Sequence, residues 1–212
     1  MVSLIKNTGS IGLPLILFSV LVYGISQDLN YWSWDRSLLL AIHQTEQPDL
    51  DRLASALTPL GTYWGVLPGS ILLVGFLFVC QRWRQGLYAL VTMSGAALMS
   101  RTLKVLLHRE RPHFWDLFLP LPTDFSFPSG HALFSLTFVI TAIVLAWESR
   151  WRWAVVLVGG SFAIAIAWTR LYLGVHYPSD ILGGWSIAIA WTMSLGRLFG
   201  LPRSPGSSAS FP

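Results

Sequence analysis

Residues Ser126–Trp147, SFPSGHALFSLTFVITAIVLAW, pass from a proline and a small polar pair into a long apolar run. From His131 to Trp147 this run contains no Asp, Glu, Lys or Arg, and uncharged runs of about this length are typical of helices that cross a membrane. Five further runs of 17 to 22 residues are similarly apolar and nearly uncharged. The six runs are Ile11–Gln27, Tyr63–Cys80, Gly86–Leu107, His131–Trp147, Trp153–Leu171 and Ile181–Phe199. The sequence therefore predicts six transmembrane helices.

The composition also indicates a membrane protein. The 212 residues are 53% hydrophobic and 11% charged, with a mean hydropathy of +0.57, which is too apolar for a water-soluble domain of this length. Lys6 precedes the first run as in a signal peptide, but no small-residue cleavage site follows, so this run is expected to be retained. We expect an all-α integral membrane bundle formed by residues 1–201 as a single domain. A disordered tail is expected over the Ser/Pro/Gly-rich residues 202–212.

A short surface helix is expected between the first two spans. Pro48 followed by an aspartate is typical of a helix start. Apolar residues then recur with helical spacing at Leu50, Leu53, Ala54 and Leu57. This helix would lie on the membrane surface or pack over the bundle, and the spacing fits both arrangements.

The distribution of charge predicts the orientation. Six spans would place both termini on one side, together with the short loops that carry Arg82, Arg84, Arg150 and Arg152. Short basic loops favour the cytoplasm, and nine of the ten carboxylates fall on the opposite side. We therefore expect a protein of the plasma (inner) membrane with both termini cytoplasmic. The net charge of +4 is not gathered into a basic patch with interleaved aromatics, so no nucleic acid partner is expected.

Three clusters of ionisable residues interrupt the apolar pattern, and all three fall at the extracytoplasmic ends of the last four runs. In the first cluster, Lys104 and Arg111 are seven residues apart, which places them on nearly the same side of a helix end. Pro112 disfavours helical geometry at the residue before it, so the helix is expected to stop there. Two such cations either hold an anion between them or extend separately to the membrane interface.

The second cluster is Ser129-Gly130-His131, at the start of the fourth run. Ser129 is expected to cap this helix, which leaves the first-turn amides of Gly130 and His131 available to an anion. Gly130 lets a ligand approach the backbone closely, and His131 would lie beside that ligand. Alternatively, His131 is an ordinary interfacial histidine without a chemical role.

The third cluster contains Arg170, His176 and Asp180. Pro178 favours an extended residue before it, so His176 is expected just outside the last helix and Asp180 in the first turn. The carboxylate would then reach back to the imidazole and fix its tautomer, as in the triad of a serine hydrolase. Alternatively, Asp180 only stabilises the helix start through the helix dipole.

Taken together, the clusters predict a phosphate site. Lys104, Arg111 and Arg170 can match the charge that develops on the oxygens of a phosphoryl group during its transfer. His176, supported by a carboxylate, is a candidate nucleophile at phosphorus, and His131 can give a proton to the leaving oxygen. No second carboxylate forms a metal-ligand pattern such as H-E-x-x-H, so catalysis without a metal or other cofactor is expected.

These motifs resemble those of the type-2 phosphatidic-acid phosphatase family, which has K-x6-R-P, then P-S-G-H, then S-R-x5-H-x3-D. The corresponding segments here are KVLLHRERP, PSGH and TRLYLGVHYPSD, and the resemblance extends over about residues 50 to 195. It implies that His176 forms a phosphohistidine, that Asp180 orients it and that His131 protonates the leaving group. It also implies a phosphate site formed by Lys104, Arg111, Ser129, Gly130 and Arg170.

The resemblance further implies a six-helix membrane core, an extracytoplasmic active site and a lipid phosphate as substrate. Candidate substrates are phosphatidic acid, phosphatidylglycerol phosphate and undecaprenyl diphosphate. One departure is Thr169, where the family usually has serine; because threonine keeps the hydroxyl, a modest effect on phosphate contact is expected.

Other functions and residues stay open. The same histidine could transfer the phosphoryl group to an acceptor lipid, or the cations could hold a lipid head group without catalysis, in a binder or transporter. A soluble haloperoxidase with a similar anion site is disfavoured by the apolar runs. Arg109 matches a frequent family arginine, but neutralisation of surface charge explains it equally well. Arg101 could line the site or extend to the interface, His108 and His113 are expected to have no catalytic role, and the oligomeric state is not predicted.

Overall fold

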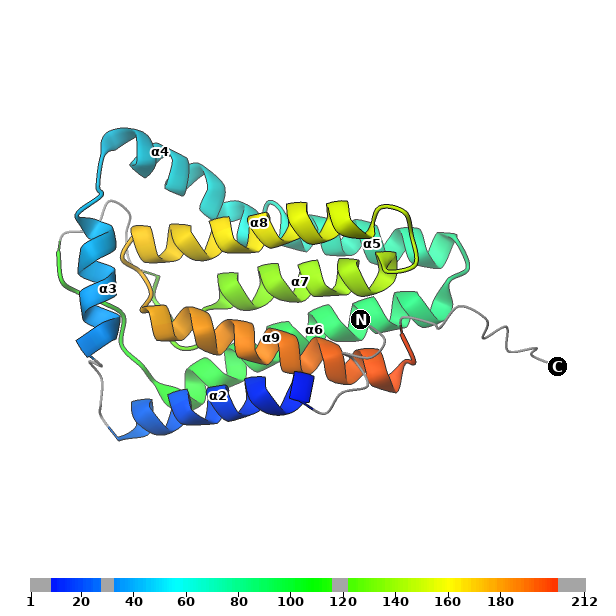
Figure 1. Cartoon of the computed structure of the whole chain (residues 1–212), viewed down its shortest axis with the longest axis horizontal. Helices are drawn as coiled ribbons and strands as arrows, with labels where there is room; N and C mark the ends of the chain where they lie inside the picture. Colours follow the sequence, from blue (N-terminus) through cyan, green and yellow to red (C-terminus); the bar gives the residue numbers. More distant parts are fainter. Residues whose placement is uncertain (1–8, 28–32, 116–121, 202–212) are drawn as a thin grey trace.

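The computed structural model describes residues 9–27, 33–115 and 122–201, and these residues form helices and no strand. The elements are α2 (Gly9–Ser26), α3 (Ser33–His43), α4 (Pro48–Leu57), the 3-10 helix η1 (Thr58–Gly61), α5 (Val66–Val79), α6 (Trp83–Leu107), α7 (Gly130–Ala146), α8 (Arg152–Tyr172) and α9 (Pro178–Leu198). Figure 1 shows α2 and α5 to α9 running along one long axis, with α3 across one end of them. The predicted all-α class is confirmed. The predicted tail, residues 202–212, lies outside the described residues.

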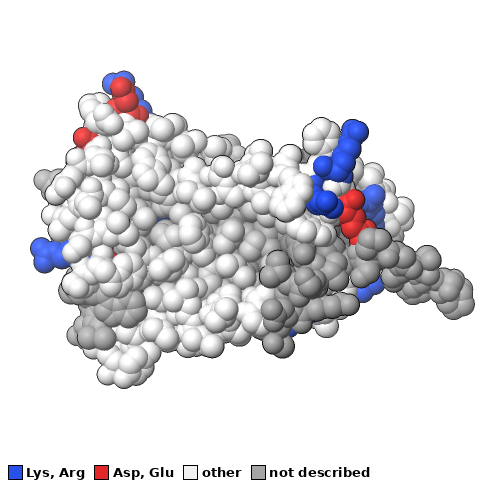
Figure 2. All heavy atoms as spheres, in the orientation of Figure 1, with Lys and Arg blue, Asp and Glu red and all other residues white. Residues whose placement is uncertain are grey.

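The six predicted spans each coincide with a helix, but not all six satisfy the length and hydropathy of a membrane span. Four stretches do so: Gly9–Ser26, Pro48–Val79, Trp83–Leu107 and Arg152–Tyr172. Helix α7 is apolar but has 17 residues, and α9 is not among these stretches. The chain therefore has the helices of an integral membrane protein, and a crossing by all six stays a prediction. The distribution of charge also suits a membrane protein. In Figure 2 the charged side chains on the face shown gather at the two ends of the molecule.

The region between the first two spans differs from the prediction. The expected surface helix forms as α4 with the expected start at Pro48, and it continues through η1 into α5. A second helix, α3, precedes it and was not predicted. Helix α3 carries Asp35 in its first turn and His43 in its last, which suits the helix dipole, and it buries Asp35 and Leu39. Helix α3 matters because the carboxylate of Asp35 accepts hydrogen bonds from Arg109 and from the amide of Ser179 at the start of α9.

Helix α9 packs against α2, α6 and α7 and is the most buried helix in the structure's described part. Small residues make this possible, since they let helix backbones approach each other closely. A Cβ atom at Gly184 would lie 2.8 Å from the carbonyl oxygen of Ser129 and 3.1 Å from the amide nitrogen of Leu133. Gly184 therefore sets the contact between α9 and the first turn of α7.

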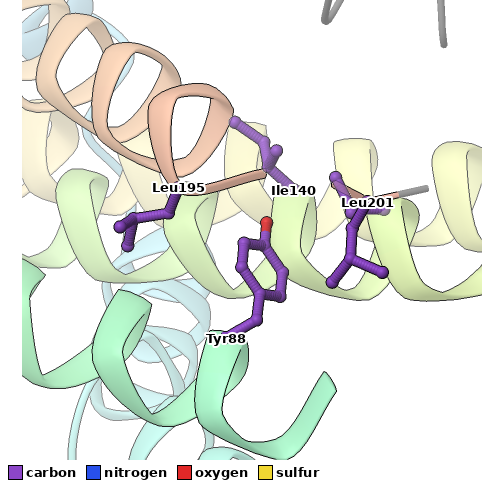
Figure 3. Close-up of a cluster of buried hydrophobic side chains, with 5 residues drawn as sticks. Tyr88, Ile140, Leu195 and Leu201 are labelled. Carbon is purple, nitrogen blue, oxygen red and sulfur yellow. The ribbon is translucent and has the colours of Figure 1, made fainter. Parts of the chain in front are cut away.

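A cluster of buried apolar side chains fixes α6, α7 and α9 relative to one another (Figure 3). Tyr88 of α6 lies among Ile140 of α7 and Leu195 of α9, with Leu201 closing the cluster. The hydroxyl of Tyr88 donates to the backbone carbonyl of Thr192, 3.4 Å away, so its polar end is also satisfied inside the bundle. This packing holds together three of the helices whose opposite ends form the site.

Replacement of Gly184 by alanine tests the contact between α7 and α9. Because the added methyl group would meet backbone atoms, we expect Gly184→Ala to lower the free energy of unfolding by about 1–3 kcal/mol. Gly160 of α8 is a matched control, since a Cβ atom there meets nothing within 4 Å. Gly160→Ala should be neutral or stabilising by up to about 1 kcal/mol, as expected for a helix interior. Thermal unfolding of both variants in detergent measures the difference, and equal midpoints would contradict the tight contact.

Candidate active site

A cavity of about 760 Å³ opens where α6, α7 and α8 end or begin, beside the loop before α9. Its lining includes six of the eight predicted site residues: Lys104, Arg111, Gly130, His131, Arg170 and His176. The remaining two, Ser129 and Asp180, are fully buried and are not part of the lining. The three sequence clusters, spread over 77 residues from Lys104 to Asp180, thus meet at one end of the bundle.

Lys104 and Arg111 reach the cavity from the end of α6 and the loop that follows. Helix α6 ends at Leu107 because His108 adopts a left-handed backbone conformation, with φ of 47°, and turns the chain across the bundle end. The Lys104 ammonium lies 2.8 Å from the carboxylate of Asp124, which also pairs with Arg111. Partial burial raises the pKa of Asp124, but Lys104 and Arg111 more than offset it and lower the pKa to about 2. Two cations therefore share one ionised carboxylate at the cavity wall.

His176 and Asp180 form a buried pair at the start of α9. His176 Nδ1 lies 3.2 Å from Asp180 Oδ2, and the backbone N–H of Tyr177 donates to the same oxygen at 2.8 Å. Because the ionised carboxylate can only accept, the proton of the neutral imidazole belongs on Nδ1. Burial, followed by the charges of Arg111 and Arg170, lowers the pKa of His176 well below its usual value. The imidazole is thus neutral, with the Nε2 lone pair turned away from Asp180.

Arg111 contacts that second nitrogen. Its NH1 lies 3.2 Å from His176 Nε2 and 2.7 Å from the carbonyl oxygen of Val175. With the proton on Nδ1, NH1 donates to the lone pair of Nε2, the atom that can act as a nucleophile, so a bound anion must take over this donor before Nε2 can attack. An anion bound by Arg111 would lie within reach of this nitrogen, which is the arrangement that attack at a bound phosphoryl group requires.

The first turn of α7 places His131 and Gly130 at the cavity. His131 Nε2 lies 3.4 Å from the hydroxyl of Thr62, and both residues line the cavity. Ser129 occupies the N-cap position of α7 as expected, but its hydroxyl forms no cap hydrogen bond. The backbone amide of Ser129 donates to the carbonyl oxygen of Asp180 at 3.1 Å. The Ser129 hydroxyl is buried with no partner among the described residues. Buried hydroxyls normally have a partner, so this group could bond a ligand oxygen or a water molecule only if the wall of the cavity opens to it, because Ser129 does not line the cavity.

Arg170 comes from the last turn of α8. Its NH1 donates to the Thr58 hydroxyl at 2.6 Å, while its buried Nε has no partner in the part of the chain that the structure describes. The neighbouring Thr169, expected to keep a role in phosphate contact, donates its hydroxyl to the carbonyl of Ile166 at 2.7 Å and does not line the cavity. Arg101 does line the cavity.

Two residues without an assigned role connect to the histidine pair. Arg109 is 4% exposed, so the explanation by surface neutralisation is wrong. Its NH1 lies 2.6 Å from Asp180 Oδ1, and its NH2 lies 2.9 Å from Asp35 Oδ2. Burial lowers the pKa of Arg109, but Asp180 and Asp35 more than offset it, and the pKa lies above its usual value. The family arginine was a sequence signal for Arg109, whereas nothing in the sequence linked Asp35 to the site.

The family model of the PAP2 superfamily matches residues 85–200, which is more than half of the chain. The chain belongs to the PAP2 superfamily. This is the type-2 phosphatidic-acid phosphatase family expected from the motifs, and the matched region contains all eight predicted site residues.

Similar proteins extend over most of this PAP2 chain. It is 28% identical over 180 residues to phosphatidylglycerophosphatase B of Bacillus subtilis, covering 82% of this chain and 88% of that protein. It is 28% identical over 181 residues to an undecaprenyl-diphosphatase of Sulfolobus acidocaldarius, covering 81% and 82%. The crystal structure of a transmembrane PAP2-type phosphatidylglycerolphosphate phosphatase from Bacillus subtilis superposes with a TM-score of 0.80 at 26% identity, covering 90% of this chain and 96% of that one.

Asp124 is expected to compete with a bound anion in this PAP2 site, because it pairs with both Lys104 and Arg111. Removal of its charge in Asp124→Asn should free both cations and strengthen inorganic phosphate binding by roughly two- to tenfold, the value of one or two half-exposed ion pairs. Isothermal titration calorimetry of inorganic phosphate binding to the purified protein at neutral pH measures the change. Glu110→Gln, an exposed neighbour in the same loop, is the control. Weaker binding by Asp124→Asn would show that the carboxylate orients the cations instead.

Proposed function

We propose that this PAP2 protein is a lipid phosphatase that cleaves its substrate through a phosphohistidine on His176. The observation that carries the proposal is the arrangement of the two imidazole nitrogens of His176. Nδ1 is held by the buried carboxylate of Asp180, and Nε2 is held beside Arg111. A histidine fixed in this way at a cationic cavity is suited to attack on phosphorus.

In the first step, the lone pair of His176 Nε2 attacks phosphorus while the bond from phosphorus to the leaving oxygen breaks. His131, on the cavity wall, gives its proton to that oxygen and releases the lipid alcohol, or a lipid monophosphate when the substrate is a diphosphate. Lys104, Arg111 and Arg170, also on the wall, hold the phosphoryl oxygens. The amide of Gly130 and the free hydroxyl of Ser129 are further donors for these oxygens.

In the second step, water attacks the phosphohistidine. His131, now neutral, takes a proton from the water, the bond between phosphorus and nitrogen breaks, and inorganic phosphate leaves. Asp180 keeps the Nδ1 proton of His176 in place during both steps and stabilises the positive charge on the ring. Each proton and electron pair is handled by a residue of the chain, so the proposed reaction is independent of metal.

An apolar groove beside the cavity supports a lipid as the substrate. The groove has a volume of about 610 Å³, lies between α5 and α6, and shares Thr62, Tyr63, Ala97 and Phe134 with the cavity. Ser70 and Ser94 also line it, but each donates its hydroxyl to a carbonyl of its own helix. The groove therefore presents a mainly apolar surface to an acyl or prenyl chain whose phosphate occupies the cavity.

The substrates proposed are phosphatidic acid, phosphatidylglycerol phosphate and undecaprenyl diphosphate. The names of the two relatives above support the second and the third, and the family resemblance of the motifs suggests the first. The proposed location is the plasma (inner) membrane, with both termini cytoplasmic and the cavity on the extracytoplasmic side. Residues 1–201 would form one domain.

Hydrolysis is tested by the release of inorganic phosphate from these three lipids by the purified protein in detergent. We expect release by the wild type to persist in EDTA and to be lost in His176→Ala, because the alanine variant has no nucleophile at phosphorus. His113→Ala is the control, since this exposed histidine is outside the cavity lining and should keep full activity. Acceptor lipids should yield no phosphorylated product; their phosphorylation would identify a phosphotransferase. Lipid binding without phosphate release by a folded wild type would instead indicate a binder or transporter.

Gly75 allows a test of the lipid groove. It lies in the groove wall, and a Cβ atom there would meet nothing within 4 Å, so Gly75→Leu should fill the groove without strain in the fold. Exclusion of two methylene groups of the lipid chain would cost about 1.6 kcal/mol, or about 15-fold in KM. We expect this rise for long-chain phosphatidic acid and not for a short-chain soluble analogue. Gly160→Leu, which has equally open surroundings on α8, should change neither KM.

A further inference from the structure

We propose that Asp35 of α3 is a positioning residue for the reaction, acting on His176 through Arg109 and Asp180. This inference rests on the proposed function, because it assigns a role in the same phosphoryl transfer. Asp35 lies outside residues 85–200, the part of the chain that the family model matches. It reaches the site because α3 packs against α8 and α9 at the end of the bundle where α9 begins (Figure 1).

Asp35 is fully buried, and both of its carboxylate oxygens have partners. Oδ1 accepts the backbone N–H of Ser179 at 2.8 Å, and Oδ2 accepts NH2 of Arg109 at 2.9 Å and the hydroxyl of Ser179. The first turn of α9 is therefore tied to α3 through one carboxylate. A buried charge with this number of donors has a fixed orientation.

Arg109 transmits the position of Asp35 to the histidine pair. Its NH1 donates to Asp180 Oδ1 and to the Ser179 hydroxyl, each at 2.6 Å, and its guanidinium carbon lies 4.3 Å from the centre of the Tyr177 ring. With Oδ1 of Asp180 engaged in this way, Oδ2 faces His176. The orientation of Asp180 thus depends on an arginine that Asp35 holds from the other side.

The charge balance of the cluster gives Asp35 an electrostatic role as well. Asp35, Arg109 and Asp180 together carry one net negative charge, in a region where all three side chains are almost completely buried. Without Asp35, the guanidinium would fully neutralise Asp180. Attack by His176 on phosphorus places positive charge on the imidazole, and a net negative neighbour in a poorly solvated region stabilises that charge. Asp35 therefore supports the transition state without touching the substrate.

The central experiment compares wild type with Asp35→Asn, which removes the charge and keeps the size of the side chain. Loss of a triad carboxylate charge costs about 10⁴-fold in other enzymes, and loss of a partner of that carboxylate is expected to cost about ten- to hundredfold in kcat. KM should stay within about twofold, because the cavity cations are unchanged. Asp49→Asn, the same substitution at an exposed site on α4, should leave both constants unchanged.

The pH profile of kcat/KM separates positioning from a merely structural role. Loss of one negative charge near His176 disfavours its protonated form, so the acid limb of the profile should move to lower pH in Asp35→Asn. The ionisable groups facing His176 stay the same in both proteins: Lys104 of α6, Arg111 and Asp124 of the following loop, His131 of α7, Arg170 of α8 and Asp180 of α9. A shift of the limb therefore reports the removal of Asp35.

Several outcomes would overturn the proposal. A folded Asp35→Asn variant with unchanged kcat would overturn it. A variant that loses kcat and phosphate binding to the same extent, with the acid limb of the pH profile unshifted, would also overturn it. If Asp35→Asn does not fold, Arg109→Lys is the variant that tests the proposal. Lysine keeps the charge but cannot bridge the carboxylates of Asp35 and Asp180 as the planar guanidinium does. A kcat of Arg109→Lys equal to wild type would overturn the proposal. An inactive wild type would refute the proposed function itself, whereas an active wild type with an unaffected Asp35→Asn would refute only the positioning role.

Discussion

The carboxylate of Asp180 is the point at which the separate parts of this protein meet. It accepts hydrogen bonds from Arg109 after α6, from Ser126 before α7, and from His176 and the Tyr177 amide before α9. A buried carboxylate is stable only when such donors surround it, and removal of one partner from a buried ion pair costs about 3–5 kcal/mol. The need to satisfy this single charge therefore holds two loops and a helix start in one arrangement.

The close packing of α9 makes that arrangement possible. Gly184 brings the start of α7 against α9, and the backbone amide of Ser129 then reaches the carbonyl oxygen of Asp180. The N-terminus of α7, with its unpaired first-turn amides, is thus directed at the same cavity as His176. The packing of the helices and the hydrogen bonds at their polar end therefore depend on each other. A shift of α7 relative to α9 would disrupt the contact at Gly184 and the hydrogen bond between Ser129 and Asp180.

The chemistry and the membrane are joined at the cavity. Cations and histidines lie at the helix ends, where charge is tolerated, and the apolar groove between α5 and α6 adjoins their cavity at Thr62, Tyr63, Ala97 and Phe134. The proposed substrate, with a phosphate head and a long apolar tail, would contact both surfaces at once. Asp35, Arg109 and Asp180 form a net negative cluster that contacts His176 through Asp180, so the residues that would hold the proposed nucleophile are separate from those proposed to bind the phosphate.

The sequence by itself determined the all-α membrane class, the approximate helix boundaries and the motif residues, because apolar runs and the spacing from Lys104 to Arg111 and from His176 to Asp180 are local patterns. The sequence placed Ser129 correctly at the N-cap of α7, but it did not reveal that the hydroxyl forms no cap hydrogen bond, or that the amide donates to the carbonyl oxygen of Asp180, 51 positions away in the chain. Only the tertiary structure revealed α3, the burial of Arg109 and its pairing with Asp35, 74 positions distant. Which residue neutralises a buried charge depends on contacts between distant segments, and the spacing along one chain contains no signal for it.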